Sequence, residues 1–382
     1  MDLILAATRA IHFGSTLVIF GELVFANFVA RPGLAAPLPT RQDQRAGDHA
    51  LRAVLAWCLG LSVASGAFWL ALEVPLMSGE PLAEAFTGPT LGVVVRKTWF
   101  GRVWMARAVL ALALGVWLAC GARRTSLWLA LAIAGAYVAL PALAGHAAGG
   151  QGAERYLRLG ADMLHLLAAG AWVGALPALA RLLVTARRSA ERAWLELAGH
   201  ATRRFSALGT LSVTALIGSG TVSAFYLVGS LTALTASDYG RLLVAKLVLV
   251  TAMLAIAGVN RWWLSPRLRE GDAVAVQALA RNAVLEALVA VGVVAIVGVL
   301  GITVPGMHTE HHELHSGTSR AIILNSPASA PSWPNPTSST SRFRKANTTI
   351  SKRSSAPMPS RRTAWIWRCS TDFSPPSSAV RR

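Results

Sequence analysis

Eight long apolar segments constrain this chain more than any other feature of its sequence. A helix needs about 20 predominantly apolar residues to cross the hydrocarbon core of a bilayer. Only 14% of the 382 residues are charged, whereas soluble domains carry roughly a quarter. We therefore expect an all-α polytopic membrane protein with about eight transmembrane helices, at residues 3–29, 51–72, 104–121, 126–145, 158–180, 205–229, 241–263 and 282–305.

Basic residues between the segments predict how the helices are oriented. The loops of membrane proteins that carry more Lys and Arg lie in the cytoplasm. The loops after segments one, three, five and seven hold sixteen basic residues, and the loops after segments two, four and six hold six. The first set should therefore be cytoplasmic, which places both termini outside. Met1-Asp2 provides no basic leader, so we expect no cleavable signal peptide.

Several short patterns occur twice in the same order, which indicates an internal repeat. His12, with Gly21 nine residues later, matches His165 with Gly174. Four helices per copy is an even number, so both copies have the same orientation, as parallel repeats do. We expect a first four-helix repeat over residues 1–146 and a second over 147–312. The other matches are Phe100-Gly101-Arg102 with Arg107 against Tyr239-Gly240-Arg241 with Lys246, Leu61-Ser62-Val63 and Ser65-Gly66 against Leu211-Ser212-Val213 and Ser219-Gly220, and Gly145-His146 against Pro305-Gly306-Met307-His308.

Residues 313–382 differ in composition from the rest of the chain. They are rich in Ser, Thr, Pro and Arg and show no hydrophobic period, which is typical of a segment that buries no core. A disordered tail and an out-of-frame translation of the true C-terminus both fit. From Ser316 on there are eleven Lys and Arg and one acidic residue, so this part supplies +10 of the formal net charge of +18. The remaining excess lies mostly in loops, so we expect no nucleic-acid partner.

Histidines gather at the predicted outer face. His12 and His165 lie in the outer thirds of segments one and five, and His146 and His308 lie at the ends of segments four and eight. A histidine inside the membrane costs free energy unless it has a partner or a task, and imidazole is a common copper and zinc ligand. We predict a metal site formed by His12, His165, His146, His308, Met307, His311 and His312. That each histidine only hydrogen-bonds a neighbouring helix is the alternative.

Charged residues inside the segments form a second candidate group. Glu22 lies ten residues after His12, about 15 Å deeper at 1.5 Å per residue, and should be paired within the bundle. Arg107 and Lys246, at equivalent repeat positions, are candidate counter-charges, and Asp162 precedes His165 by three residues. One interpretation is an intramembrane relay from the outer histidines towards the cytoplasm. The other is a single buried ion pair.

Scattered motifs in the second half resemble the copper resistance protein D family. They begin with His165-Leu166-Leu167-Ala168-Ala169-Gly170-Ala171-Trp172-Val173-Gly174 and continue with Arg204-Phe205-Ser206, Gly218-Ser219-Gly220, Tyr239-Gly240-Arg241 with Lys246, and Asn260-Arg261 before Pro266. The resemblance is strongest over residues 158–308. It implies a bacterial inner-membrane protein that moves copper, alongside a periplasmic copper-binding partner. It assigns the copper-handling motif to His165, Trp172 and Gly174. The departure is at the C-terminus, where relatives continue after a histidine-containing segment in a way that the tail of this chain does not.

Copper transport through an outer-face histidine site is therefore the predicted function, with copper as the bound ion and the lipid bilayer as the surroundings. We expect no enzyme activity, because phosphate-binding glycine loops, nucleophile elbows and helical zinc-protease motifs do not occur in the sequence. Two alternatives stay open. One is an electron-transfer protein that holds haem non-covalently between histidines, and the other is an assembly factor that delivers copper to a respiratory enzyme. The oligomeric state is not predicted.

Overall fold

The computed structural model describes residues 2–30, 41–79, 81, 84, 90–120, 127–144, 152–189, 191–228, 233–269 and 273–303. Within these ranges the chain is helical and contains no strand. Eight helices are long and apolar enough to cross a membrane. The prediction of an all-α polytopic membrane protein with eight transmembrane helices is confirmed, and the lipid bilayer is its surroundings. Residues 313–382 lie outside the described residues.

The first half contains four long helices, one for each of the first four apolar segments. They are α1 (Asp2–Val24) with the π-helical turn η1 (Phe25–Ala30), α3 (Arg41–Ser78), α6 (Trp99–Ala119), and α7 (Leu127–Ala139) with the 3₁₀ turn η3 (Leu140–Ala144). The connection between α3 and α6 includes the short helix α5 (Thr90–Lys97). Hydropathy marks only the lipid-crossing part of a helix. Good helix formers such as Ala, Leu, Arg and Gln extend α3 into the polar region.

The helices of the second half follow the same plan with more interruptions. They are α8 (Gly152–Trp172) with α9 (Leu176–Ser189), α10 (Arg192–Val228), α11 (Ala233–Ala236), α12 (Asp238–Val259) with the π-helix η5 (Asn260–Leu264) and α13 (Ser265–Arg269), and α14 (Ala273–Leu300). The fifth segment was predicted as one span, but it is broken over residues 173–175. Gly174 lies at this break.

The break lets the backbones of α1 and the α8–α9 segment touch. A Cβ atom added to Gly21 would overlap the carbonyl of Gly174, and one added to Gly174 would overlap the carbonyl of Leu17. Both glycines lie nine residues after the histidine of their own half. The repeat-equivalent glycines therefore meet each other where the two halves cross.

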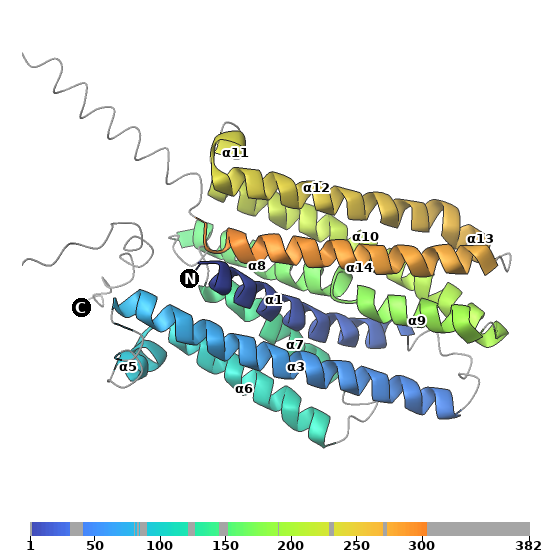
Figure 1. Cartoon of the computed structure of the whole chain (residues 1–382), viewed down its shortest axis with the longest axis horizontal. Helices are drawn as coiled ribbons and strands as arrows, with labels where there is room; N and C mark the ends of the chain where they lie inside the picture. The colour runs from blue at the N-terminus through green and yellow to red at the C-terminus, as the bar shows by residue number, and fades with distance from the viewer. Residues whose placement is uncertain are drawn as a thin grey trace, which may run out of the picture. The chain divides into compact units, whose positions relative to one another are not determined.

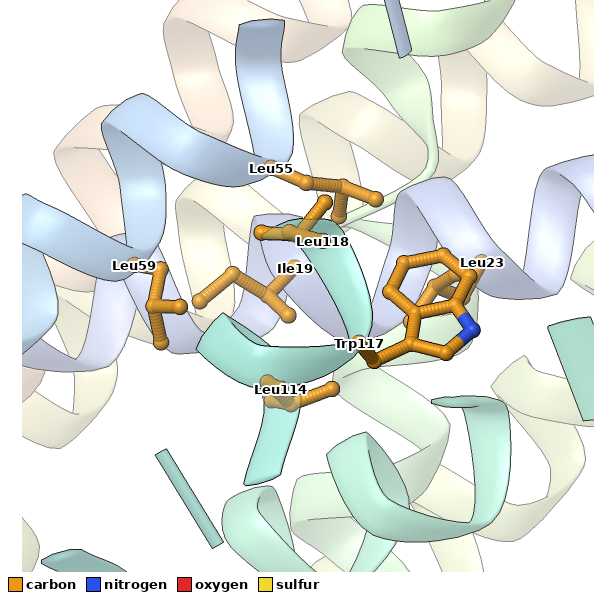
Figure 2. Close-up of a pocket in the computed structure, with 7 residues that line it drawn as sticks. All are labelled: Ile19, Leu23, Leu55, Leu59, Leu114, Trp117 and Leu118. Carbon is orange, nitrogen blue, oxygen red and sulfur yellow. The ribbon is translucent and has the colours of Figure 1, made fainter. Parts of the chain in front are cut away.

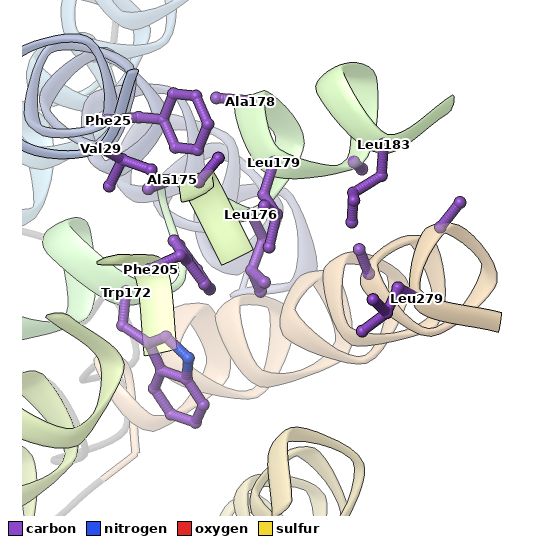
Figure 3. Packing of buried hydrophobic residues seen from close by; sticks show 14 of the residues in the cluster. Phe25, Val29, Trp172, Ala175, Leu176, Ala178, Leu179, Leu183, Phe205 and Leu279 are labelled. Atoms are coloured by element: carbon purple, nitrogen blue, oxygen red, sulfur yellow. The ribbon is translucent and has the colours of Figure 1, made fainter. Parts of the chain in front are cut away.

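Helix α1 of the first half lies where the two halves meet. It contacts α3 and α7 on one side and α8, α9 and α14 on the other, and Figure 1 shows the long helices running side by side around it. Two apolar clusters result. One joins α1, α3, α6 and α7, where Ile19, Leu55 and Leu114 close around a small apolar cavity (Figure 2). The other joins η1 to α9, α10 and α14, and its members include Leu176, Leu183 and Leu279 (Figure 3).

Candidate functional site

His12 is completely buried in the first half and is fixed by both ring nitrogens. Its Nδ1 lies 2.9 Å from the carbonyl oxygen of Ser62 and 3.3 Å from Oγ of Ser65, both on α3. A carbonyl only accepts, so Nδ1 carries the proton and Nε2 has the lone pair. That lone pair faces Nη2 of Arg107 on α6, which donates to it. The other guanidinium nitrogen, Nη1, donates to the Tyr137 carbonyl at 2.9 Å.

Aromatic rings close the pocket around His12. Trp69 and Trp104 have their ring centroids 5.6 and 5.4 Å from the imidazole, and they lie 5.3 Å from each other. Arg9, one turn before His12 on α1, stacks on Trp69 at 4.5 Å. We call His12, Arg9, Trp69, Trp104 and Arg107 the His12 cluster. It combines two guanidinium groups with one imidazole, so its charge is positive.

His165 is half-buried and occupies the matching position in the second half. Its Nδ1 lies 3.1 Å from Oγ of Ser219 on α10. The Ser219 hydroxyl donates to the Ala215 carbonyl at 2.6 Å, so it accepts the Nδ1 proton. The lone pair of His165 is therefore on Nε2, and within the described residues no donor is bonded to it.

An acidic side chain accompanies His165. Asp162 lies one turn earlier on α8 and accepts a hydrogen bond from the hydroxyl of Ser223 at 2.9 Å. Lys246 on α12 is close enough for its charge to act on Asp162 and on the imidazole. We call His165, Asp162, Ser219, Ser223 and Lys246 the His165 cluster. One acid and one base balance each other there, and hydroxyls replace the tryptophan rings.

The contacts of the two clusters agree with the repeat. Gly66 packs on the His12 ring as Gly220 packs on the His165 ring. Thr98 caps α6 by accepting from the Gly101 amide, and Ser237 caps α12 by accepting from the Gly240 amide. The expected match of Ser65-Gly66 to Ser219-Gly220 is therefore in register. The expected match of Ser62 to Ser212 is not in register. The residue of the second half that faces its imidazole as Ser62 does is Leu216.

The two histidines contact different helices. The hydrogen bonds of His12 run to α3 and α6, whereas that of His165 runs to α10. Within the described residues, no group of three or more His, Cys, Asp or Glu side chains could hold a metal ion. The other predicted ligands, His146, Met307, His308, His311 and His312, lie outside the described residues. Met163 lines an apolar groove against α6 and α7, and its position two residues from His165 puts it on another helix face.

The counter-charge of Glu22 differs from the one expected. Glu22 is 1% exposed and forms two parallel hydrogen bonds with Arg181 of α9, at 2.8 and 2.6 Å. The expectation that Arg107 or Lys246 would neutralise it was wrong, since those residues lie in the His12 and His165 clusters. Arg181 had been assigned to a loop, but α9 carries it into the bundle. A bidentate pair with Arg is the strongest arrangement for a carboxylate, and it joins the two halves.

Sequence comparison decides the family. Residues 199–300 match the model of copper resistance protein D, and residues 1–156 match that of the copper resistance protein D-like N-terminal domain. The inner membrane protein YebZ of Escherichia coli K12 is 30% identical over 267 residues, which cover 70% of this chain and 86% of that protein. The chain belongs to the copper resistance protein D family.

Two further relatives carry copper in their names. Copper resistance protein D of Pseudomonas syringae pv. tomato is 29% identical over 254 residues, covering 62% of this chain and 82% of that protein. Copper transport protein CutJ of Bacillus subtilis 168 is 29% identical over 209 residues, covering 52% of this chain but only 38% of that protein. No solved structure matches the chain. The predicted resemblance is confirmed, and the chain is a multi-pass inner-membrane protein of a copper-related family.

Proposed function

We propose that this protein moves copper ions across the inner membrane and that the His165 cluster holds the ion within the described helices. The observation that carries the proposal is the Nε2 lone pair of His165, which no described donor engages. A neutral imidazole nitrogen of this kind is the form that binds copper. Asp162 lies on nearly the same face of α8, because three residues turn a helix by about 300°. Its carboxylate would attract a cation to the imidazole.

The His12 cluster supports a different role in the same pathway. A copper ion and the Arg107 guanidinium would compete for one lone pair and repel each other. We propose that His12 binds copper only when Arg107 withdraws, so that it forms a second station. Trp69 and Trp104 would exclude water there.

The outer ligands complete the proposal. His146, Met307, His308, His311 and His312 would capture copper at the outer face, where the basic-residue bias also places both termini. A periplasmic copper-binding protein is the partner that we expect to deliver the ion. The protein would act without enzyme activity of its own.

The haem alternative gains nothing from the described helices. An apolar cavity and an apolar groove between them are lined without any histidine, and the hydrogen bonds of His12 and His165 run to different helices. Delivery of copper to a respiratory enzyme without transport stays an alternative. It predicts the same copper site but no movement of copper through the protein.

The test is copper uptake into proteoliposomes that contain the full chain and an internal copper chelator. We expect uptake well above that of protein-free liposomes, and a loss of tenfold or more in His165→Ala. His200→Ala is the matched control, because His200 is exposed and bonds only to Arg203 within the described residues. If wild type moves copper neither into nor out of the liposomes faster than protein-free liposomes do, transport is overturned. Bound copper without uptake would support the delivery role instead.

A further inference from the structure

Helix α14 carries a buried carboxyl group that the copper pathway does not use. Glu286 is 3% exposed, and α14 extends thirteen residues before it and fourteen after it. At 1.5 Å per residue, each end of the helix is about 20 Å away. Glu286 therefore lies near the middle of α14 and four residues inside the apolar segment 282–305, and an acidic residue within a membrane segment is expensive and usually functional.

A chain of amide groups leads to this carboxyl. Nδ2 of Asn282, one turn earlier on α14, donates to Oδ1 of Asn260 at 2.8 Å. Nδ2 of Asn260 then donates to Oε1 of Glu286 at 2.6 Å. The second oxygen, Oε2, receives no hydrogen bond from the described residues. Oε1 of Glu286 therefore accepts from a neutral amide, and Oε2 is available to bind a proton.

The π-helix η5 brings Asn260 to this position. The amide of Ser265 donates to the Asn260 carbonyl five residues back, and the Ser265 hydroxyl donates to the same oxygen at 2.7 Å. The wider turn fixes the Asn260 backbone while its side chain reaches α14. Single π-helical turns are rare and occur frequently at functional sites.

Two arginines on the neighbouring elements are engaged elsewhere. Arg181 of α9 binds Glu22, and Arg261 of η5 donates to Ser206 and Thr210 of α10. Within the described residues Glu286 forms no ion pair. The other charged residue of α14 is Arg281, and the titratable and charged groups on the elements packed against α14 are Asp2, Arg9, His12 and Glu22 of α1, Arg181, Arg187 and Arg188 of α9, Asp238, Tyr239, Arg241 and Lys246 of α12, Arg261 of η5, and Arg267 of α13.

We propose that Glu286 is a reversible proton-binding site and that its proton is the coupling ion of transport. An ionised carboxylate that is 3% exposed and has no counter-cation among the described residues is costly, and addition of one proton to Oε2 neutralises it. A metal cation would need oxygen ligands, whereas Asn260 presents N–H groups to the carboxyl. Glu22 provides the contrast, because its charge is already matched by Arg181.

The coupling step depends on the packing of α14 against α1. At Gly298 an added Cβ would overlap the Ala6 carbonyl of α1, so the two backbones touch. His12 lies on the same helix α1, six residues later. A shift of α14 on protonation would therefore be transmitted to the His12 cluster. This coupling rests on the proposed copper transport, but the proton site itself does not.

Infrared difference spectroscopy of the purified full chain, titrated from neutral to acidic pH without copper, tests the proton site. We expect a protonated-carboxyl band that Glu286→Gln removes. Asn260→Leu should shift this band, because it removes the hydrogen bond to Oε1. Glu196→Gln is the matched control, since Glu196 is an exposed acid paired with Arg192 on α10. A spectrum unchanged in Glu286→Gln would overturn the proposal.

Proteoliposomes with a trapped pH indicator test the coupling. We expect copper movement to be accompanied by proton movement in wild type and Glu196→Gln, and Glu286→Gln to lose the proton flux by tenfold or more. Copper transport with unchanged proton flux in Glu286→Gln would overturn the coupling and leave the proposed function intact. Copper transport that depends on sodium and moves no protons would overturn it as well. No copper transport by wild type would instead contradict the proposed function, and the infrared result would stand.

Discussion

At the scale of single residues, Gly174 and Gly21 determine how closely the two halves approach. Gly174→Ala should lower stability by about 2 kcal/mol or more, because its Cβ would overlap the Leu17 backbone and α1 would have to move. Gly160→Ala, on α8 and with open space around it, should be neutral or stabilising by up to about 1 kcal/mol. Denaturation in detergent checks both variants. Equal effects of the two would contradict the crossing contact.

The ion pair between Glu22 and Arg181 makes an asymmetric prediction. Arg181→Ala should destabilise the protein by about 3 kcal/mol, because it leaves a 1% exposed carboxylate without a partner. Glu22→Gln should cost less, because the side chain of Arg181 is 40% exposed and water can solvate it. Combining the two changes should recover part of the loss. The surface pair of Arg192 and Glu196 is the control, and Arg192→Ala should leave the melting temperature unchanged.

The candidate site was only partly predictable from individual residues. His12 and His165 stood out because histidine is rare in a membrane segment. Their partners did not, because a backbone carbonyl such as that of Ser62 has no sequence signature. Asn260 was visible in the sequence only as part of the family motif. Glu286 gave no repeat or motif signal, although a lone carboxyl in an apolar helix would have been sufficient reason to examine it.

At the scale of elements, the same cap begins the third helix of each half. Thr98→Ala and Ser237→Ala should each cost about 1 kcal/mol, because each removes an acceptor for a first-turn amide. Thr221→Ala should cost less, since its hydroxyl only bonds its own helix at Ile217. Thermal unfolding of the three variants checks this. A larger effect for Thr221→Ala would contradict the capping role.

The number of elements was easier to predict than their interruptions. Eight spans follow from apolar length alone, because the bilayer sets that length. The break at residues 173–175 lies where Gly174 touches α1, and hydropathy shows neither this break nor the π-helical turns. The sequence drew attention to Gly174 only because Gly21 occupies the matching position in the first half, and it did not predict a break in the helix.

At the scale of the whole molecule, the basic-residue bias makes a topology prediction. Cys120, which is exposed at the end of α6, should face the cytoplasm. In a Cys58→Ser, Cys369→Ser variant it is the single remaining thiol. A membrane-impermeant maleimide should label this variant in inverted vesicles and not in intact spheroplasts. Labelling in spheroplasts would reverse the proposed orientation.

The division into repeats over residues 1–146 and 147–312 stays a prediction that the matched contacts support. Its physical basis is the equivalence of environments, because Gly66 and Gly220 pack on the two imidazoles and the two caps use the same geometry. The chemistry of the halves has nevertheless diverged. Arg9 and Trp69 occupy the positions that Asp162 and Ser223 hold in the second half. The repeat alone therefore does not predict that the His12 and His165 clusters have different roles.

The copper content of the purified full chain tests the central claim most directly. After incubation with copper and removal of unbound ion, elemental analysis should find copper in wild type and in His200→Ala. We predict that His165→Ala loses most of the bound copper and that a His12→Ala, His165→Ala double variant loses at least as much. Copper content in the double variant equal to that of wild type would contradict the histidine pathway.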